Sequence, residues 1–351
     1  MEGRLDSLID EFVPETLYGV TISVSVEGKI VYMRSKGRIE DLDFYYTNDT
    51  IYDLASLTKP LVTSLLTLRL IENGRISLWD TVGDLHLFEE YKNIKKFTIE
   101  NLLSHTTGMV PDSPLYREGK TRDAYLKGID RIAERSFPGK REIYSDLNYI
   151  LLGFIIEKLY SDSLDRIWRR EIGEVIGLKN SYFNPDIDRR RIAPTEYSDE
   201  RGLLWGKVND EKSYYLGGVA GNAGLFSDAH DIIELRHSLM LGKIIKKSTM
   251  EMAVTNRNKY LGGIFGLGWM VKTEKGQIRS ESFNYTGFLG DYSPLGTFGH
   301  TGFTGTSLCA NLEKNVVCVL LSNATFPRRG KREGIIRMRR LFHNIVFSSI
   351  D

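Results

Sequence analysis

Strand-like and helix-like stretches follow one another along this chain in an order that restricts its fold. Residues 19–37 alternate apolar and small polar residues around a turn at Gly28, which predicts a β-hairpin. From about 54 to 245 the apolar residues recur at helical spacing, which predicts helices at 56–73, 98–104, 121–135, 146–160 and 227–241. Strands return between 265 and 322, and a helical apolar stripe follows from 335 to 345.

The two ends of the chain therefore supply the strands, and the middle supplies the helices. Strands from both ends most simply join one antiparallel sheet. We expect an α/β (α+β) fold in which helices flank this sheet. Residues 1–58 and 246–351 form its discontinuous α/β domain, and residues 59–245 form an inserted all-helical domain. A ligand site is expected in the crevice between the domains, walled by loops around 110–120, 200–215 and 280–297.

The charges of the chain are nearly balanced. Lysine and arginine total 47 and aspartate and glutamate total 46, a formal net charge of +1, so no overall field attracts nucleic acid or an anionic membrane. Basic residues gather at 327–340, but an apolar helical stripe runs between them, and we interpret this stretch as a solvated helix face. The expected partner is a small molecule and not a nucleic acid.

The apolar stretches are too short or too interrupted for a secretion signal or a membrane span. Asp6, Asp10 and Glu11 interrupt the first helical stretch. The longest apolar run, 149–156, ends at Glu157, well short of the roughly 20 residues that a membrane helix needs. We expect a cytoplasmic protein with no membrane partner.

Cys309 and Cys318 are the two cysteines of the chain, and they lie on predicted strands joined by a short turn. A cross-strand disulfide is one possibility. Two reduced thiols that pack as small hydrophobic groups are the other. We expect the reduced form in a chain with no secretion signal.

Ser56 and Lys59 lie three residues apart at the start of the helix predicted at 56–73. That spacing puts both side chains on one helical face, where the amine can reach the hydroxyl. The first turn of a helix also favours negative charge on a serine oxygen. However, a capping serine beside a solvated lysine leaves the same pattern, and a chain of this length contains about one S-x-x-K by chance. The pair alone does not establish a nucleophile.

Two later segments change the interpretation of this pair. YSD stands at 144–146 and HTG at 300–302. Together with S-x-x-K, in this order, they resemble the S-x-x-K, Y-x-N and K/H-[ST]-G motifs of the serine β-lactamase and penicillin-binding-protein family. The resemblance is to its branch of class C β-lactamases, D,D-peptidases and esterases. Further segments that match this branch lie at 98–109, 174–183, 217–232 and 265–269.

The resemblance implies catalytic roles for three residues. Ser56 would be the nucleophile that takes up the acyl group, and Lys59 and Tyr144 would share the removal of its proton. A phenol ionises near pKa ~10 in water, and a neighbouring ammonium lowers that pKa. In this branch the tyrosine is the usual candidate for the base, and later for activating water.

The third motif would lie along the strand next to the nucleophile. The resemblance places the oxyanion between the backbone N–H groups of Ser56 and Phe303, and such donors are commonly worth ~3 kcal/mol each. Thr301 and His300, beside Gly302, would bind a carboxylate of the substrate. A neutral histidine does this less strongly than a lysine.

Asp146 departs from the family pattern, which most often has asparagine at this position. A carboxylate only accepts hydrogen bonds, whereas an amide also donates them. We expect Asp146 to pair with Lys59 and hold it charged, and to offer no donor to a substrate amide carbonyl. This shifts the expected substrates from lactams and peptides toward esters.

The expected reaction is acyl transfer to Ser56 and hydrolysis of the acyl-enzyme, with a small ester, amide or short peptide as substrate. A D-amino-acid peptidase, D,D-carboxypeptidase or β-lactamase proper is the alternative within this class, and a non-catalytic binding or assembly module is the alternative outside it. We expect no metal and no organic cofactor, since the sequence has no H-E-x-x-H, no compact Cys/His cluster and no phosphate loop after a strand. The oligomeric state stays open.

Overall fold

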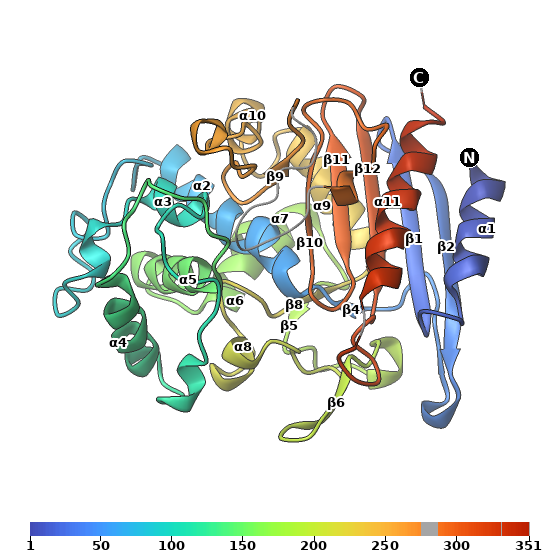
Figure 1. Ribbon diagram of the computed structural model, residues 1–351, viewed down its shortest axis with the longest axis horizontal. Helices are drawn as coiled ribbons and strands as arrows, with labels where there is room; N and C mark the ends of the chain where they lie inside the picture. Colours follow the sequence, from blue (N-terminus) through green and yellow to red (C-terminus); the bar gives the residue numbers. More distant parts are fainter. Residues whose placement is uncertain (275–286, 331, 351) are drawn as a thin grey trace.

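The computed structural model describes residues 1–274, 287–330 and 332–350. A seven-stranded sheet runs in the order β3-β2-β1-β12-β11-β10-β9 (Figure 1). β1 (Gly19–Val26) pairs antiparallel with β12 (Val316–Ser322), so the two ends of the chain meet inside the sheet, as predicted. The other strands of the sheet are β2 (Lys29–Ile39), β3 (Phe44–Tyr45), β9 (Met270–Val271), β10 (Phe298–Thr301) and β11 (Ser307–Asn311).

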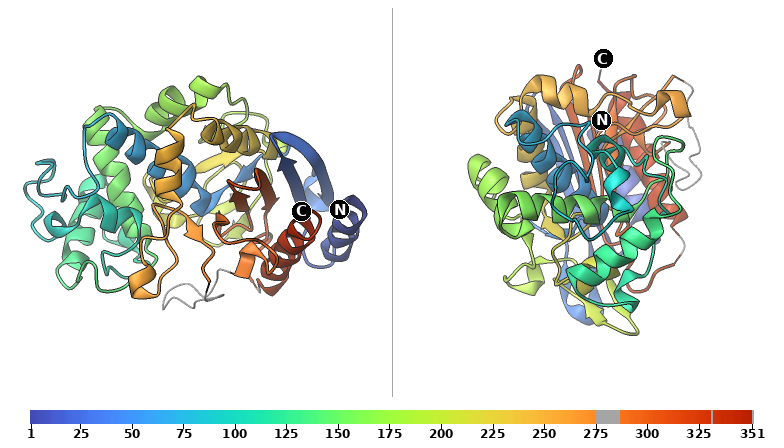
Figure 2. Two further views of the ribbon diagram at one scale, coloured as in Figure 1. Left: turned by 90° about the horizontal axis from the view of Figure 1, so that it is seen from above. Right: turned by 90° about the vertical axis from the view of Figure 1, so that its left-hand side faces the viewer.

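Helices cover both faces of this sheet (Figures 1 and 2). α1 (Glu2–Phe12) and α11 (Glu333–Phe347) share a core with Val20 and Ile22 of β1. α9 (Ala229–Met240) packs against β1 and β12 and shares the other core with Val319. Thr21, which alternation would place in water, is therefore buried and bonds to the Tyr52 hydroxyl at 2.8 Å. The alternation predicted the strand, but it did not predict that α9 covers the polar face of the strand.

The helices of the middle of the chain pack around α5 (Asp146–Tyr160), whose residues 147–157 are all buried. The helix predicted at 146–160 is confirmed, and the side chain of Ser145 caps it by accepting the N–H of Leu147. Within the described residues, every helix is too short or too polar to cross a membrane. The remaining helices are α2 (Leu65–Glu72), α3 (Ile99–Leu103), α4 (Arg122–Ala133), α6 (Leu164–Trp168), α7 (Glu174–Ile176), α8 (Glu211–Tyr215) and α10 (Lys247–Ala253).

Short strands join the middle of the chain to the region before Ser56. β4 (Tyr52–Asp53) pairs with β8 (Leu225–Ser227), which also pairs with β5 (Tyr182–Phe183). β6 (Glu196–Ser198) and β7 (Gly202–Leu204) form a separate hairpin. α9 falls inside the predicted helical domain, 59–245, although it packs on the large sheet. The domain boundaries stay a prediction.

The segment that contains Ser56 is helical, but it is not the single regular helix predicted at 56–73. A 3₁₀ turn (Ala55–Leu57) leads into a π-helix (Lys59–Ser64) and then into α2. Pro60 lies in the first turn of the π-helix, where a backbone N–H would have no hydrogen-bond partner within the helix. Single π turns are frequent at functional sites.

Close contacts hold the turn just before the nucleophile candidate. Ala55 has a φ of 48°, in the left-handed region that residues other than glycine rarely adopt. The buried Asp53 carboxylate accepts the N–H of Ala55 at 2.8 Å. Thr306 donates to the carbonyl of Leu54 at 3.1 Å, and a Cβ at Gly302 would lie only 2.5 Å from that oxygen. Glycine at 302 therefore lets the turn after β10 approach this segment.

Cys309 and Cys318 lie directly opposite each other on β11 and β12. Both are buried free thiols in this structure, and the reduced form stays a prediction. Burial raises the pKa of both thiols, which keeps them protonated and unreactive.

Arg236 on α9 is a buried cation. Its side chain is fully buried, and none of its guanidinium nitrogens has a hydrogen-bond partner in the described part of the chain. The guanidinium lies 4.8 Å from the ring centre of Phe298. Burial lowers the pKa of Arg236 to about 9. An unpaired charge in such a place opposes folding.

We expect Arg236→Met to raise the free energy of unfolding by about 1–3 kcal/mol, because methionine has no charge to desolvate. Urea unfolding followed by circular dichroism measures the difference. Arg339→Met is the matched control, since Arg339 is also buried but donates to two backbone carbonyls, and it should lose stability. An equal loss of stability in both variants would contradict this account of Arg236.

Candidate active site

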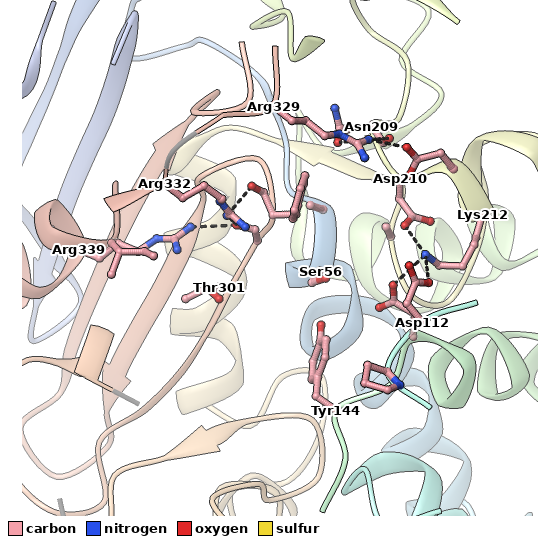
Figure 3. Close-up of a pocket in the computed structure, with 18 residues that line it drawn as sticks. Ser56, Asp112, Tyr144, Asn209, Asp210, Lys212, Thr301, Arg329, Arg332 and Arg339 are labelled. Carbon is pink, nitrogen blue, oxygen red and sulfur yellow. Dashed lines mark hydrogen bonds and ion pairs between the residues drawn. The ribbon is translucent and has the colours of Figure 1, made fainter. Parts of the chain in front are cut away.

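A cavity of about 330 Å³ lies where the end of β10 meets the start of α5 and α8 (Figure 3). Its volume is at the lower end of the range for small-molecule sites. The predicted site residues that line it are Ser56, Tyr144, Asp146, Thr301, Gly302 and Phe303. The structure thus brings together three segments that are far apart in the sequence.

Lys59 contacts Ser56 and is fully buried. Its ammonium donates to Ser56 Oγ at 2.9 Å and to the carbonyl of Asn222 at 3.0 Å, and it lies 2.7 Å from Asp146 Oδ1. Burial disfavours the charge of Lys59, but Asp146 and Tyr144 outweigh this effect and raise its pKa. Lys59 is therefore a charged hydrogen-bond donor and not a free base.

Tyr144 is the remaining candidate for the base. Its side chain is buried, with the ring centre 5.0 Å from Lys59 Nζ and 4.6 Å from the ring of His105. Burial raises the pKa of Tyr144, and the charge of Lys59 and hydrogen bonds to Lys59 and Ser56 lower it. Burial prevails, so the pKa is above its ordinary value. This corrects the expectation that Lys59 would bring the pKa of the phenol below that value.

Asp146 lies between two lysines. Oδ1 is 2.7 Å from Lys59 Nζ and Oδ2 is 3.2 Å from Lys212 Nζ. Burial would raise the pKa of Asp146, but the two lysines lower it to about 2. The predicted pair with Lys59 is present. The second partner, Lys212 in α8, was not predicted.

His300 does not line the cavity. It is 1% exposed, and its Nδ1 lies 2.8 Å from the carbonyl oxygen of Thr301. Burial, and next the charge of Lys59, lowers the pKa of His300 to about 3. A neutral, buried ring is a poor ligand for a carboxylate, so the structure corrects the carboxylate-binding role predicted for His300. Thr301 does line the cavity.

Phe303 lines the cavity and lies in the turn that follows β10. The next residue, Thr304, donates to the carbonyl of Asp53 at 2.7 Å, which holds this turn against the segment of Ser56. Arg332 donates to the carbonyl of Phe303 at 2.6 Å. The role of Phe303 in binding the oxyanion stays a prediction.

Three arginines of the C-terminal basic stretch also line the cavity: Arg329, Arg332 and Arg339. This corrects the interpretation of 327–340 as a solvated helix face. Arg329 forms ion pairs with Glu196 and Glu211. Arg332, by contrast, forms no ion pair within the described residues.

Two of the three loops expected to wall the site do so. Pro111 and Asp112 come from the first, and 209–212 from the second. In the third, 280–286 lie outside the described residues, and 287–297 do not line the cavity. Among the described residues, no group of three or more His, Cys, Asp or Glu side chains is arranged to hold a metal ion.

Comparison with known proteins places this chain in a family. A family model described as Beta-lactamase matches residues 5–340. A putative D-alanyl-D-alanine carboxypeptidase of Salmonella agona (strain SL483) is 30% identical over 364 residues, which cover 91% of this chain and 82% of that protein. A protein of the same name from Escherichia coli O157:H7 is 30% identical over 366 residues, with 92% and 82% covered.

Solved structures share the fold. The octameric penicillin-binding protein homologue from Pyrococcus abyssi matches with a TM-score of 0.69 at 23% identity, over 92% of this chain and 73% of that one. EstCE1, a hydrolase with promiscuous acyltransferase activity, matches with a TM-score of 0.74 at 20% identity, over 98% of each chain. The chain therefore belongs to the Beta-lactamase family and is a serine hydrolase of the β-lactamase and penicillin-binding-protein type.

Proposed function

We propose that this serine hydrolase cleaves a small amide or ester whose leaving group carries a free carboxylate. The observation that supports this most directly is Arg332, a guanidinium without an ion pair among the described residues, in the cavity that also contains Ser56 and Thr301. Guanidinium groups bind carboxylates strongly, often through two hydrogen bonds. The relatives are named putative D-alanyl-D-alanine carboxypeptidase, and the substrate in that name ends in such a carboxylate.

In the proposed mechanism the phenolate form of Tyr144 is the base: Ser56 Oγ attacks the carbonyl carbon, and its proton passes to the phenolate oxygen of Tyr144. The backbone N–H groups of Ser56 and Phe303 stabilise the oxyanion. Tyr144 then gives the proton to the leaving group, and a water hydrolyses the acyl-enzyme by the same route in reverse. Lys59 stays charged throughout and favours the phenolate of Tyr144 during proton transfer.

An ester is the second candidate substrate, and Asp146 favours it. Both oxygens of Asp146 are in ion pairs, and a carboxylate offers no N–H to a substrate amide carbonyl. Amide hydrolysis at this site would rely on donors from elsewhere. The small cavity supports a small substrate in either case, and the cytoplasmic location stays a prediction.

The carboxylate requirement is tested with D-Ala-D-Ala and its C-terminal amide. We expect kcat/KM to be at least about tenfold higher for the acid, a difference of ~1.4 kcal/mol. Arg332→Met should remove this preference. Arg328→Met is the matched control, because Arg328 is an exposed neighbour paired with Asp199, and it should keep the preference. Equal turnover of acid and amide by the unmodified enzyme would exclude this proposal.

Tyr144 as base predicts activity that rises with pH. Its pKa lies above the ordinary value, so phenolate is a minor form at neutral pH and increases about tenfold for each pH unit. We expect log kcat/KM for an uncharged ester to rise with a slope near one up to about pH 9, and Tyr144→Phe to lose both activity and slope. A plateau that begins below pH 8 would argue against Tyr144 as the base.

A further inference from the structure

The walls of the cavity carry opposite charges on the two sides of Ser56. Figure 3 shows Ser56 between Arg332 and Arg339 on one side and Asp112 and Lys212 on the other. The arginine side suits the carboxylate of the leaving group. On the opposite side, carboxylates outnumber ammonium groups.

Lys212 lies at the centre of this second side and is surrounded by carboxylates. Its ammonium is 2.7 Å from Asp112, 3.0 Å from Asp210 and 3.2 Å from Asp146. Lys59 adds the one other cation in contact with Asp146 among the described residues. Three carboxylates and two ammonium groups leave one negative charge on this wall. Tyr144 does not change this sum, because its raised pKa keeps it neutral.

Asp112 is the carboxylate that a ligand can reach. Its side chain is 67% exposed, whereas those of Asp146 and Asp210 are 17% and 16% exposed. Its contacts with Lys212 and with the N–H of Ser113 both use Oδ1. Oδ2 has no partner in the part of the chain that the structure describes and is available to a ligand at the cavity.

The arginine side has the complementary charge. Arg329 and Arg201 both form ion pairs with Glu196 and Glu211, so the charges of these four side chains cancel. Arg332 adds a positive charge without a carboxylate beside it in the described part of the chain. A ligand that spans Ser56 therefore meets a positive wall at one end and a negative wall at the other.

We propose that the acyl half of the substrate carries a free ammonium group that binds Asp112, so that the substrate is an unblocked dipeptide or a zwitterion of similar size. This inference rests on the proposed function, which places the carboxylate of the leaving group at Arg332. The cavity of about 330 Å³ suits a ligand of this size. An N-acylated peptide would bring no charge to balance the negative wall.

The test measures binding to Ser56→Ala by titration calorimetry, so that turnover does not interfere. The probes are D-Ala-D-Ala, N-acetyl-D-Ala-D-Ala and D-Ala-D-Ala amide, and each of the last two lacks one charge. We expect N-acetylation to weaken binding about tenfold or more. Adding Asp112→Asn to the Ser56→Ala variant should weaken binding of D-Ala-D-Ala by a similar factor. Binding of the N-acetyl peptide should not change. Asp199→Asn, which removes an exposed carboxylate paired with Arg328, is the matched control. It should change the binding of neither D-Ala-D-Ala nor its N-acetyl form.

The outcomes separate this inference from the proposed function. Equal binding of the free and the N-acetylated dipeptide overturns the ammonium subsite, even if the amide binds weakly and the carboxylate assignment therefore stands. Equal binding of acid and amide overturns the carboxylate assignment, and the effect of N-acetylation still decides on the ammonium. Absence of detectable D-Ala-D-Ala binding at millimolar concentration overturns the inference as well.

Discussion

The buried ion pair between Lys59 and Asp146 is the contact on which the rest of the active site depends. Lys59 is fully buried, and an unpaired ammonium there would cost several kcal/mol. Asp146 meets it at 2.7 Å from the first residue of α5, and Ser56 and Asn222 supply its other acceptors. These partners belong to separate segments of the chain, so satisfying one charge fixes how the segments meet.

A carboxylate at position 146 extends this electrostatic network toward the cavity wall. Asp146 pairs with Lys212 as well as with Lys59, and Lys212 in turn contacts Asp112 and Asp210. A neutral amide would not need a second cation. Ser56 is thus linked, through two lysines and their carboxylates, to the exposed Asp112 in the wall of the cavity. Removing Asp146 would leave Lys59 charged and buried with no carboxylate beside it among the described residues, which is far more costly than removing a surface pair.

Sequence patterns predicted the elements whose burial follows a simple period, such as the helical stripe at 335–345, where Ile335, Met338 and Phe342 are buried on one face of α11. The irregular segment at 55–64 escaped prediction because nearly all of its side chains are buried, which leaves no period to detect. Lys212 and Arg332 are single charged residues without a motif, and only the tertiary structure brings them near Ser56. The role of His300 was misjudged because a strand motif does not reveal the burial that lowers the pKa of its ring.

We propose that Ser56, held by charged Lys59, is the residue that becomes acylated. Intact-mass measurement after incubation with a fluorophosphonate or a penicillin tests it most directly. We expect a single adduct on the unmodified protein, located at Ser56 by peptide mapping and absent from Ser56→Ala. No adduct on the unmodified protein with either reagent, or an adduct that persists in Ser56→Ala, would contradict it.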